Sequence, residues 1–365
     1  MNELSMRKIC VLIDTNIWRS ETLLRTPLGV ALLYAVRQND AKLGMPEVIK
    51  REIKKQILQS GMEAFDRMVK SGRLLQRLLN SSVDPLLSSR SPERKIEQAI
   101  QDRLIELQPL MIHVPLTLDH VRRALDRVDA GLPPSGGRKQ QYKDCLIWEA
   151  ARDLATDYVV YIVSQDAAFF ENKSLAKALF RECSQEGFEI KAFPSLQDVL
   201  VDLAPAVPNI DRDALSRLVA AEALSSATAM LKSLRGFTLG DLLNLDVKVF
   251  GTEDPSRLSA TFEAAYNLSG SPQDPKYGYV DAVFNASLKV SGSFTLIPAS
   301  DQLLDFIGYH GVFSWAGPDG ISREMYTILT SSGKSTLTIG PAIRAMPDGA
   351  SFDFATNVIN VLDEG

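Results

Sequence analysis

The sequence predicts an α/β fold built on a parallel sheet over residues 1–205, followed by a helix and a smaller β-rich domain. Two observations lead to this prediction. Uninterrupted apolar runs, ICVLI at 9–13 and YVVYIV at 158–163, are typical of strands buried on both faces, and they alternate along the chain with helical patterns. From residue 241 onward, short stretches alternate apolar with polar residues between Gly, Pro, Asp and Ser, which is typical of antiparallel strands. The 365 residues also exceed what one hydrophobic core usually covers, so two domains are expected.

The helices expected in the first domain share apolar residues at helical spacing, and Pro27 suits the first turn of the earliest one. They cover residues 27–38, about 46–59, the second half of 110–128, 138–155, 174–183 and 196–204. A helical insertion is expected over about 60–112, with a break near SSVDPLLSSRSP. A short extended piece is expected at LMIHV and a last strand in FEIKAFPS. A linker helix is then expected within 206–240, and a β-rich domain of unknown role over 241–365.

Composition and the lack of targeting signals are those of an ordinary cytoplasmic protein. Apolar residues make up 45% and charged residues 23%, and no apolar tract is long enough to span a bilayer. The N-terminus MNELSMRK lacks the apolar core of a secretory signal. Cys10, Cys145 and Cys183 form neither a disulfide framework nor a CxxC metal pair. We therefore expect a cytoplasmic protein with reduced thiols and no membrane contact.

The net charge of −5 hides an asymmetry between the two parts of the chain. Residues 1–200 carry 29 Lys and Arg against 26 Asp and Glu, whereas residues 201–365 carry 11 against 19. Residues 42–103 alone hold 13 basic against 8 acidic side chains. This positive bias suits contact with phosphates. Charge alone is explained equally well by a solvated helical face.

Four acids occupy positions where side chains can meet. Asp14 directly follows ICVLI, and Asp166 follows YVVYIV after two residues, so both lie at the carboxyl ends of strands, where open parallel sheets bind ligands. Asp144 heads the apolar stripe of its helix, and Glu52 neighbours the stripe of the helix after KLGMP. Carboxylates that converge near a core repel one another unless something positive neutralises them.

Nearby basic residues are one source of that positive charge, namely Arg51, Arg138, Lys139 and Lys143. A divalent cation is the better one. Mg²⁺ and Mn²⁺ prefer oxygen ligands and retain several waters, which suits a few acids at the open end of a cleft. The sequence therefore predicts a Mg²⁺ or Mn²⁺ site made of Asp14, Glu52, Asp144 and Asp166.

Each acid also has an ordinary structural interpretation. Asp14 could cap the following turn, Asp144 could complement a helix dipole, and Asp166 could open a turn, while Glu52 suits a helix surface. Their order along the chain favours the metal site over these separate roles. The three histidines lack metal-site spacing, and Cys145 has no histidine nearby in the sequence to activate it as a nucleophile.

This order of features resembles the PIN-domain nucleases. The matching segments are the strand followed by Asp14-Thr15-Asn16, the helix PEVIKREI with Glu52, the KD pair with Asp144 opening a helix, and the strand followed by Ser164-Gln165-Asp166. The resemblance covers about residues 7–203 and is nearest to larger bacterial forms with an additional C-terminal domain, although the long insertion departs from compact members. It implies an α/β/α sandwich and acids that bind Mg²⁺ or Mn²⁺ to cleave single-stranded RNA. It does not explain the tail.

The resemblance also implies a role for each matching residue. Direct metal ligands would be Asp14, Asp144 and Asp166. Glu52 would be a ligand or a base that positions water, and Asn16 and Ser164 would hold the carboxylates in place. Three basic residues beside the GLPPSGG loop would hold the substrate backbone: Arg138, Lys139 and Lys143.

The sequence thus leads to a metal-dependent endonuclease as the main hypothesis, with RNA favoured over DNA. The tail would serve regulation, self-association or binding of a protein partner, and the resemblance to PIN-like toxins and defence effectors suggests a similar cellular role. Two alternatives remain. One is a structure-specific DNase of the flap-endonuclease type, although the sequence shows no helix-hairpin-helix signal for duplex binding. The other is a non-catalytic nucleic-acid-binding module whose acids hold no metal.

Overall fold

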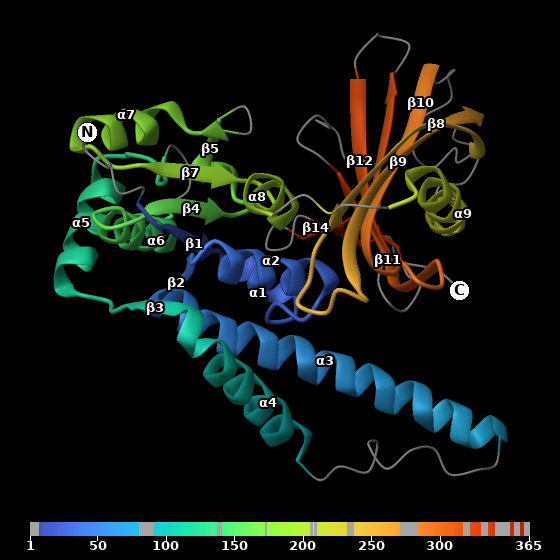
Figure 1. The fold of residues 1–365 in the computed structure, drawn as a ribbon, viewed down its shortest axis with the longest axis horizontal. Coiled ribbons are helices and arrows are strands. Elements are labelled where there is room, and N and C mark those ends of the chain that lie inside the picture. The colour runs from blue at the N-terminus through green and yellow to red at the C-terminus, as the bar shows by residue number, and fades with distance from the viewer. Residues whose placement is uncertain are drawn as a thin grey trace. The chain divides into compact units, whose positions relative to one another are not determined.

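The computed structural model divides the chain into two compact units, Met1–Ala204 and Pro205–Gly365 (Figure 1). It describes residues 7–79, 91–136, 141–171, 174–204, 207, 210–231, 237–270, 284–316, 322–329, 335–339, 351–353 and 358–360. None of the helices in these ranges combines the length and the apolar character needed to cross a bilayer.

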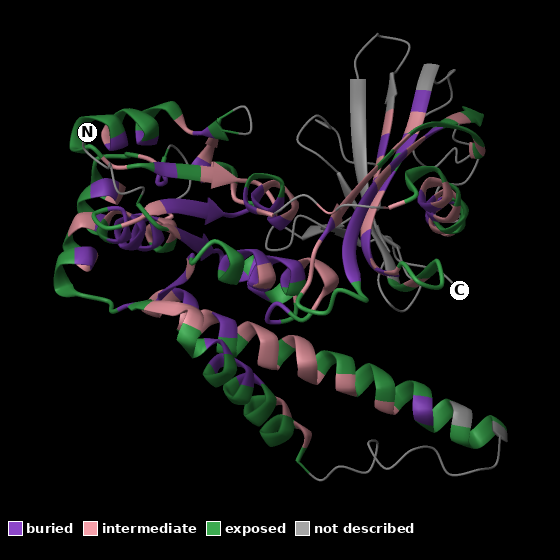
Figure 2. Ribbon diagram, in the orientation of Figure 1, coloured by how far each residue is buried: buried purple, intermediate pink, exposed green. Residues whose placement is uncertain are grey.

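The first unit is built on a five-stranded parallel sheet in the order β3-β2-β1-β4-β7. The strands are β1 (Ile9–Ile13), β2 (Lys42–Pro46), β3 (Met111–Val114), β4 (Val159–Val163) and β7 (Ile190–Phe193). The strands β1 and β4 are buried at every residue after their first, as their continuous apolar runs predict, and β2 is buried to the same extent (Figure 2). The predicted α/β fold with a parallel sheet is confirmed.

The helices of this unit pack against the sheet in pairs. Contacts join α2 to α8 and both to the sheet, while α5 contacts α6, and α6 in turn contacts β2 and β4. Gly44 of β2 allows this close approach, because a Cβ there would lie 2.9 Å from the side chain of Leu154 on α6. The helices are α1 (Thr15–Ser20), α2 (Pro27–Gln38), α3 (Glu47–Leu79), α4 (Pro92–Leu107), α5 (Leu118–Asp129), α6 (Tyr142–Leu154), α7 (Lys177–Glu186) and α8 (Leu196–Leu203). Short 3-10 turns η2 (Gln108–Leu110) and η3 (Ala167–Phe169) and a small hairpin, β5 (Phe170–Glu171) and β6 (Ser174–Leu175), complete the unit.

Helix α3 differs from the prediction in its length. A helix over about 46–59 and a separate insertion were expected, but α3 runs without interruption from Glu47 to Leu79. Gly61 lies in its interior, where glycine usually weakens a helix. Here it lets α4 approach, since a Cβ at Gly61 would lie 3.0 Å from the Cγ2 of Ile96. The insertion is therefore the distal half of α3 together with α4, and the stretch at 80–90 lies outside the described residues.

The connection between α1 and α2 carries local backbone strain. Thr22, Leu23 and Leu24 all have a left-handed backbone, with φ of 46°, 58° and 59°. For residues with a Cβ this costs about 1–2 kcal/mol each. Arg103 of α4 stabilises the turn, because its guanidinium donates to the carbonyl oxygens of Leu23 (3.1 Å) and Leu24 (2.9 Å). Gly29 gives the turn its space, since a Cβ there would lie 2.4 Å from the Cα of Leu24.

Replacing Arg103 with Ala is expected to lower the free energy of unfolding by about 3 kcal/mol. The variant leaves two carbonyl groups of a strained turn without their charged donor, and bonds to charged groups contribute more than neutral ones. An Arg103→Lys variant should recover only part of the loss, because an ammonium cannot present the planar fork that serves both carbonyls. Denaturant unfolding measures the change, with Arg94→Ala on the exposed face of α4 as the control. A cost for Arg103→Ala equal to that of the control would contradict this account of the turn.

The second unit combines one helix with an eight-stranded antiparallel sheet in the order β14-β15-β13-β12-β11-β10-β9-β8. The elements are α9 (Arg212–Leu231), β8 (Phe237–Phe250), β9 (Leu258–Gly270), β10 (Phe284–Ile297), β11 (Gln302–Ala316), β12 (Ser322–Leu329), β13 (Ser335–Ile339), β14 (Ser351–Asp353) and β15 (Val358–Asn360). Along α9, Val219, Ala223 and Ala227 are buried in one apolar cluster with side chains of β9 and β10. The predicted helix followed by antiparallel strands is confirmed, but residues 237–240, expected in the helical segment, begin strand β8.

Candidate active site

The site begins where β1 and β4 end side by side. Ile13 pairs with Val163, so Asp14 and Ser164 leave the sheet as neighbours. The side chain of Asp14 is only 7% exposed and is held from both sides. Its Oδ1 accepts from the backbone N–H of Thr15 (2.6 Å), which caps α1, and its Oδ2 accepts from the hydroxyl of Ser164 (2.9 Å). The carboxylate therefore caps a helix and joins a second strand end at the same time.

Ser164 also links Asp14 to the third predicted aspartate. Its Oγ accepts a hydrogen bond from the backbone N–H of Asp166 (3.0 Å) while its hydroxyl donates to Asp14. The Oδ1 of Asp166 accepts from the backbone N–H of Ala168 (2.9 Å), which caps η3. The amide of Gln141 donates to Asp166 from the segment before α6, at 3.3 Å to Oδ1. One buried hydroxyl thus joins the carboxylate of Asp14 to the backbone of Asp166.

Glu52 joins this cluster from α3. Its Oε2 accepts from the hydroxyl of Thr15 (2.7 Å), and its Oε1 accepts from the side-chain amide of Gln56 (2.7 Å). Oε1 also forms an ion pair with the ammonium of Lys143, which is carried by α6. Thr15 and Lys143 therefore tie the second turn of α3 to the starts of α1 and α6.

Asp144 completes the set from the first turn of α6. Burial raises the pKa of its carboxyl to about 7, and the negative charges of Asp166, Asp14 and Glu52 add to the shift, against the opposing charge of Lys143. Burial also raises the pKa of Asp14, although the hydrogen bonds from Ser164 and Thr15 act in the other direction. These mutual effects show that the four acids share one electrostatic environment. Each negative charge there makes ionisation of the next acid less favourable, and a bound cation would oppose this effect.

The other predicted site residues are placed less uniformly. Lys143 contacts Glu52, but Asn16 is exposed and makes no hydrogen bond within the described part of the chain. Arg138 and Lys139 lie outside the described residues. Sequence reasoning assigned no role to Thr15 or Gln141, which both donate hydrogen bonds to the acids. The position of Thr15 in the DTN segment was the available signal, since a buried hydroxyl after Asp14 needs an acceptor.

The chemistry of these side chains fits a hard divalent cation, because all four offer carboxylate oxygens and repel one another. Their present arrangement is looser than a coordination shell. Across the residues that the structure describes, no group of three or more His, Cys, Asp or Glu is placed so that it could hold a metal ion. Glu52 and Asp14 instead direct their oxygens at Thr15, Lys143 and Ser164. Binding of a cation would require these hydrogen-bonded carboxylates to turn toward one centre.

Comparison with known proteins gives this site a family. Residues 11–169 match the model of the PIN domain, and this range begins within β1 and contains all four acids. No curated protein and no solved structure matches the chain. The match covers the parallel sheet as far as β4 and ends in η3. Residues 11–169 of this chain therefore belong to the PIN domain, a family of nucleases, and an additional β-rich region follows toward the C-terminus.

Proposed function

We propose that this protein is a metal-dependent endonuclease that hydrolyses phosphodiester bonds in single-stranded RNA. The observation that supports the proposal is the electrostatic coupling of Asp144 with Asp14, Glu52 and Asp166 in a PIN domain, with Asp14 and Asp166 following the adjacent strands β1 and β4. In open α/β sheets this edge is the usual place for a ligand, above all where the strand order reverses. The order reverses between β1 and β4, the strands that carry Asp14 and Asp166.

Each acid has a role in the proposed reaction. Asp14, Asp144 and Asp166 would hold Mg²⁺ or Mn²⁺, which would supply a water of lowered pKa and stabilise the leaving oxygen. Glu52 would be a further ligand or the base that orients the water. Ser164 joins the carboxylate of Asp14 to the backbone of Asp166 through two hydrogen bonds, 2.9 and 3.0 Å long. Lys143 exchanges its ion pair with Glu52 for a substrate phosphate, and its half-exposed position leaves it free to do so.

RNA is the proposed substrate because the PIN family implies a nucleic acid and because no duplex-binding motif is evident in the sequence. Single-stranded RNA is recognised through its backbone and its unpaired bases, which an open site at the end of a sheet can reach. The same activity would serve a toxin or a defence effector. Expression of the wild type should then slow cell growth, while expression of Asp14→Asn should not, and equal growth would argue for a housekeeping role.

The direct test is cleavage of labelled nucleic acid by the whole chain. Single-stranded RNA should be cut in Mn²⁺, and EDTA or the Asp14→Asn substitution should reduce the rate at least about a hundredfold, because even partners of metal ligands contribute 10- to 100-fold. Single-stranded DNA, duplex DNA and a flapped duplex form the comparison series. Preferred cutting of the flap would favour the structure-specific DNase. Undiminished cleavage by Asp14→Asn would contradict metal-dependent cleavage at the four acids.

A non-catalytic binding module is the second candidate. It is supported by the ion pair of Glu52 with Lys143, which neutralises one acid without a metal. Calorimetric titration with Mn²⁺ separates the two functions. Heat of binding that disappears in Asp14→Asn supports the nuclease, whereas RNA binding without any Mn²⁺ binding supports the module.

A further inference from the structure

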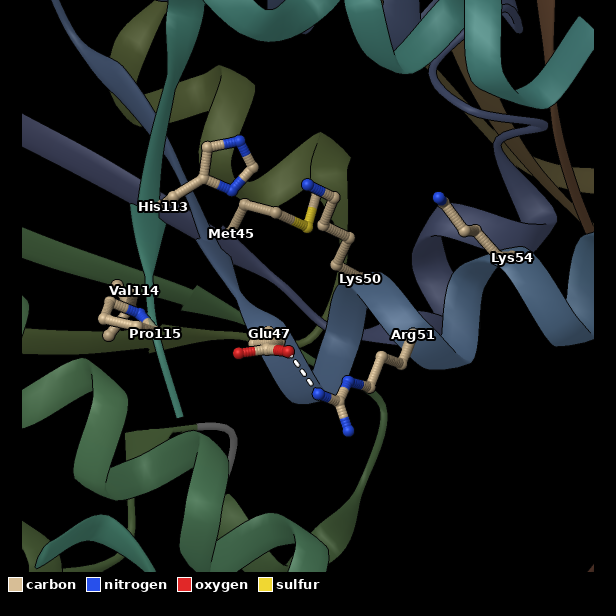
Figure 3. Close-up of a pocket in the computed structure, with 8 residues that line it drawn as sticks. All are labelled: Met45, Glu47, Lys50, Arg51, Lys54, His113, Val114 and Pro115. Carbon is tan, nitrogen blue, oxygen red and sulfur yellow. Dashed lines mark hydrogen bonds and ion pairs between the residues drawn. The ribbon is translucent and has the colours of Figure 1, made fainter. Parts of the chain in front are cut away.

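A pocket of about 470 Å³ lies between α3 and β3, apart from the four acids (Figure 3). This volume falls within the usual range of small-molecule sites. Lys50 and Lys54 line one side, and His113 of β3 lies across from Lys50. Pro115 and, to a small extent, Val114 contribute apolar surface, and the lining Met45 is fully buried behind them. The pocket thus combines cationic side chains, one aromatic ring and an apolar wall.

The pocket is positively charged, and its two lysines form no ion pair with an acid among the described residues. Lys50 and Lys54 are one turn apart on α3 and therefore share a face. Lys50 is half-buried and makes no ion pair within the described residues, and Lys54 donates to a neutral partner, the side-chain oxygen of Gln101 (3.2 Å). Glu47 is the acid among the lining residues, and its carboxylate is paired with Arg51. An anion is the missing partner for the two lysines.

His113 offers the pocket a neutral ring. Burial and the charge of Lys50 lower the pKa of His113, so the imidazole is uncharged at neutral pH. A neutral ring beside an apolar wall suits stacking of a nucleobase, as aromatic side chains do in many single-strand-binding proteins. The three features together match the parts of a nucleotide. The lysines suit its phosphate, the imidazole ring suits its base, and the apolar wall suits its sugar.

The pocket lies within reach of the acids. Glu52 belongs to the same helix and lies between Lys50 and Lys54 in sequence, but it points to the other side, toward Thr15. A strand that passes from Glu52 to the two lysines has to follow half the circumference of α3, roughly 16–19 Å for a helix about 10–12 Å in diameter with side chains. Arg51 lies on the helix surface between these two sides, where it pairs with Glu47.

We propose that the pocket between α3 and β3 binds one nucleotide of the cleaved strand, a few positions from the cleaved bond, with its phosphate on Lys50 and Lys54 and its base on His113. This inference rests on the proposed function for the identity of the ligand, a single-stranded nucleic acid. It assigns a binding subsite rather than a catalytic role. The pocket holds the strand while the acids act on a phosphodiester farther along it.

Binding of a fluorescein-labelled single-stranded RNA in EDTA tests the pocket without cleavage. The double variant Lys50→Gln/Lys54→Gln should bind about tenfold more weakly, and the slope of log K against log salt should fall by about 1–2, as expected when one or two phosphate contacts are lost. The matched control is Lys55→Gln/Lys70→Gln, two exposed lysines on the same helix, which should change affinity less than about twofold. His113→Ala should weaken binding by roughly fivefold or more, and His113→Phe should restore it, because any aromatic ring can stack on a base. Thermal melts of all variants should match the wild type, since these side chains lie at the surface.

The outcomes separate this proposal from the nuclease activity. Equal affinity of the pocket double variant and its control would overturn the subsite, even if the wild type cleaves RNA in Mn²⁺. Pocket-dependent binding by a protein that cleaves nothing would support the subsite and remove the nuclease. Competition by a poly-glutamate of equal charge, as strong as that by RNA, would show a general anion site and overturn nucleotide recognition.

Discussion

The Asp144→Asn variant is expected to lose cleavage activity and to gain stability at pH 8. The activity loss follows from its proposed place as a metal ligand and should be at least about a hundredfold. The stability gain follows from its pKa of about 7, which burial and the neighbouring acids raise far above the ordinary aspartate value of 3.8. A neutral amide of the same shape avoids the cost of holding a fourth negative charge in the cluster.

The sign of the pH dependence follows from proton binding. Between about pH 4 and pH 7 the folded state keeps the proton on Asp144 while the unfolded state has released it, so the wild type loses stability as the pH rises. The Asp144→Asn variant does not lose stability in this way, because its amide does not titrate. The advantage of Asp144→Asn should therefore grow from about pH 5 to pH 7 and level off above about pH 8, where it reaches about 2 kcal/mol after allowance for solvent screening.

Denaturant unfolding across this pH range measures the effect, with the exposed Asp66→Asn on α3 as the control. Mn²⁺ should stabilise the wild type more than Asp144→Asn, because a ligand that binds only the folded state raises its stability. A variant that is less stable than the wild type at pH 8 would show that Asp144 is held by favourable contacts rather than strained by repulsion.

Replacing Glu149 with Ala is expected to have the largest effect on stability, about 3–5 kcal/mol, because it removes the fully buried carboxylate that three arginines share. The buried Arg127 then keeps only the partly exposed Glu182 as an acidic partner among the described residues. Glu149 lies in α6 with no exposed surface. Its Oε1 contacts Arg127 at 2.5 Å, and its Oε2 contacts Arg152 at 2.8 Å and Arg123 at 3.3 Å. Arg127 is itself buried and also binds the carbonyl of Pro133 (2.7 Å), so this network fixes α6, and with it Asp144, against α5 and the following loop.

The matched control for Glu149→Ala is Glu186→Ala. Glu186 pairs with the same Arg152 at 2.7 Å but lies at the surface, so its loss should cost less than about 1 kcal/mol. A double variant, Glu149→Gln with Arg127→Met, should cost less than the sum of the two single changes, because it removes both sides of a buried pair. Equal costs for Glu149→Ala and Glu186→Ala would mean that water already screens the network.

The sequence predicted the parallel sheet because its strands carry strong and local signals. The runs at 9–13 and 159–163 are apolar throughout, and the acids that end them stand out for that reason. The start of β8 escaped prediction for a physical cause. Its pairing with β9 shifts register between Leu239 and Leu242 and again between Leu242 and Asn244, and each irregularity resets the alternation of inward and outward side chains.

The candidate site was predictable in its acids but not in its supporting contacts. Asp14 and Asp166 follow strands, so topology alone brings them together. The hydrogen bond from Thr15 to Glu52 joins residues 37 positions apart and depends on where α3 lies relative to α1, which no local pattern encodes. The unbroken length of α3 was missed for a similar reason, since the close approach of Ile96 that Gly61 permits comes from another helix.

The two hydrogen bonds that Asp14 accepts distinguish it from Asp144 as a proton acceptor. Both of its carboxylate oxygens are acceptors, one from Thr15 and one from Ser164, whose oxygen also accepts from the N–H of Asp166. A proton on Asp14 would compete with one of these bonds, so they favour its ionised form and oppose the burial that raises its pKa. Asp144 accepts no hydrogen bond within the described residues, and its pKa is raised to about 7. Near neutral pH the carboxyl at the start of α6 therefore exchanges its proton with solvent, whereas the carboxylate after β1 is held by donors.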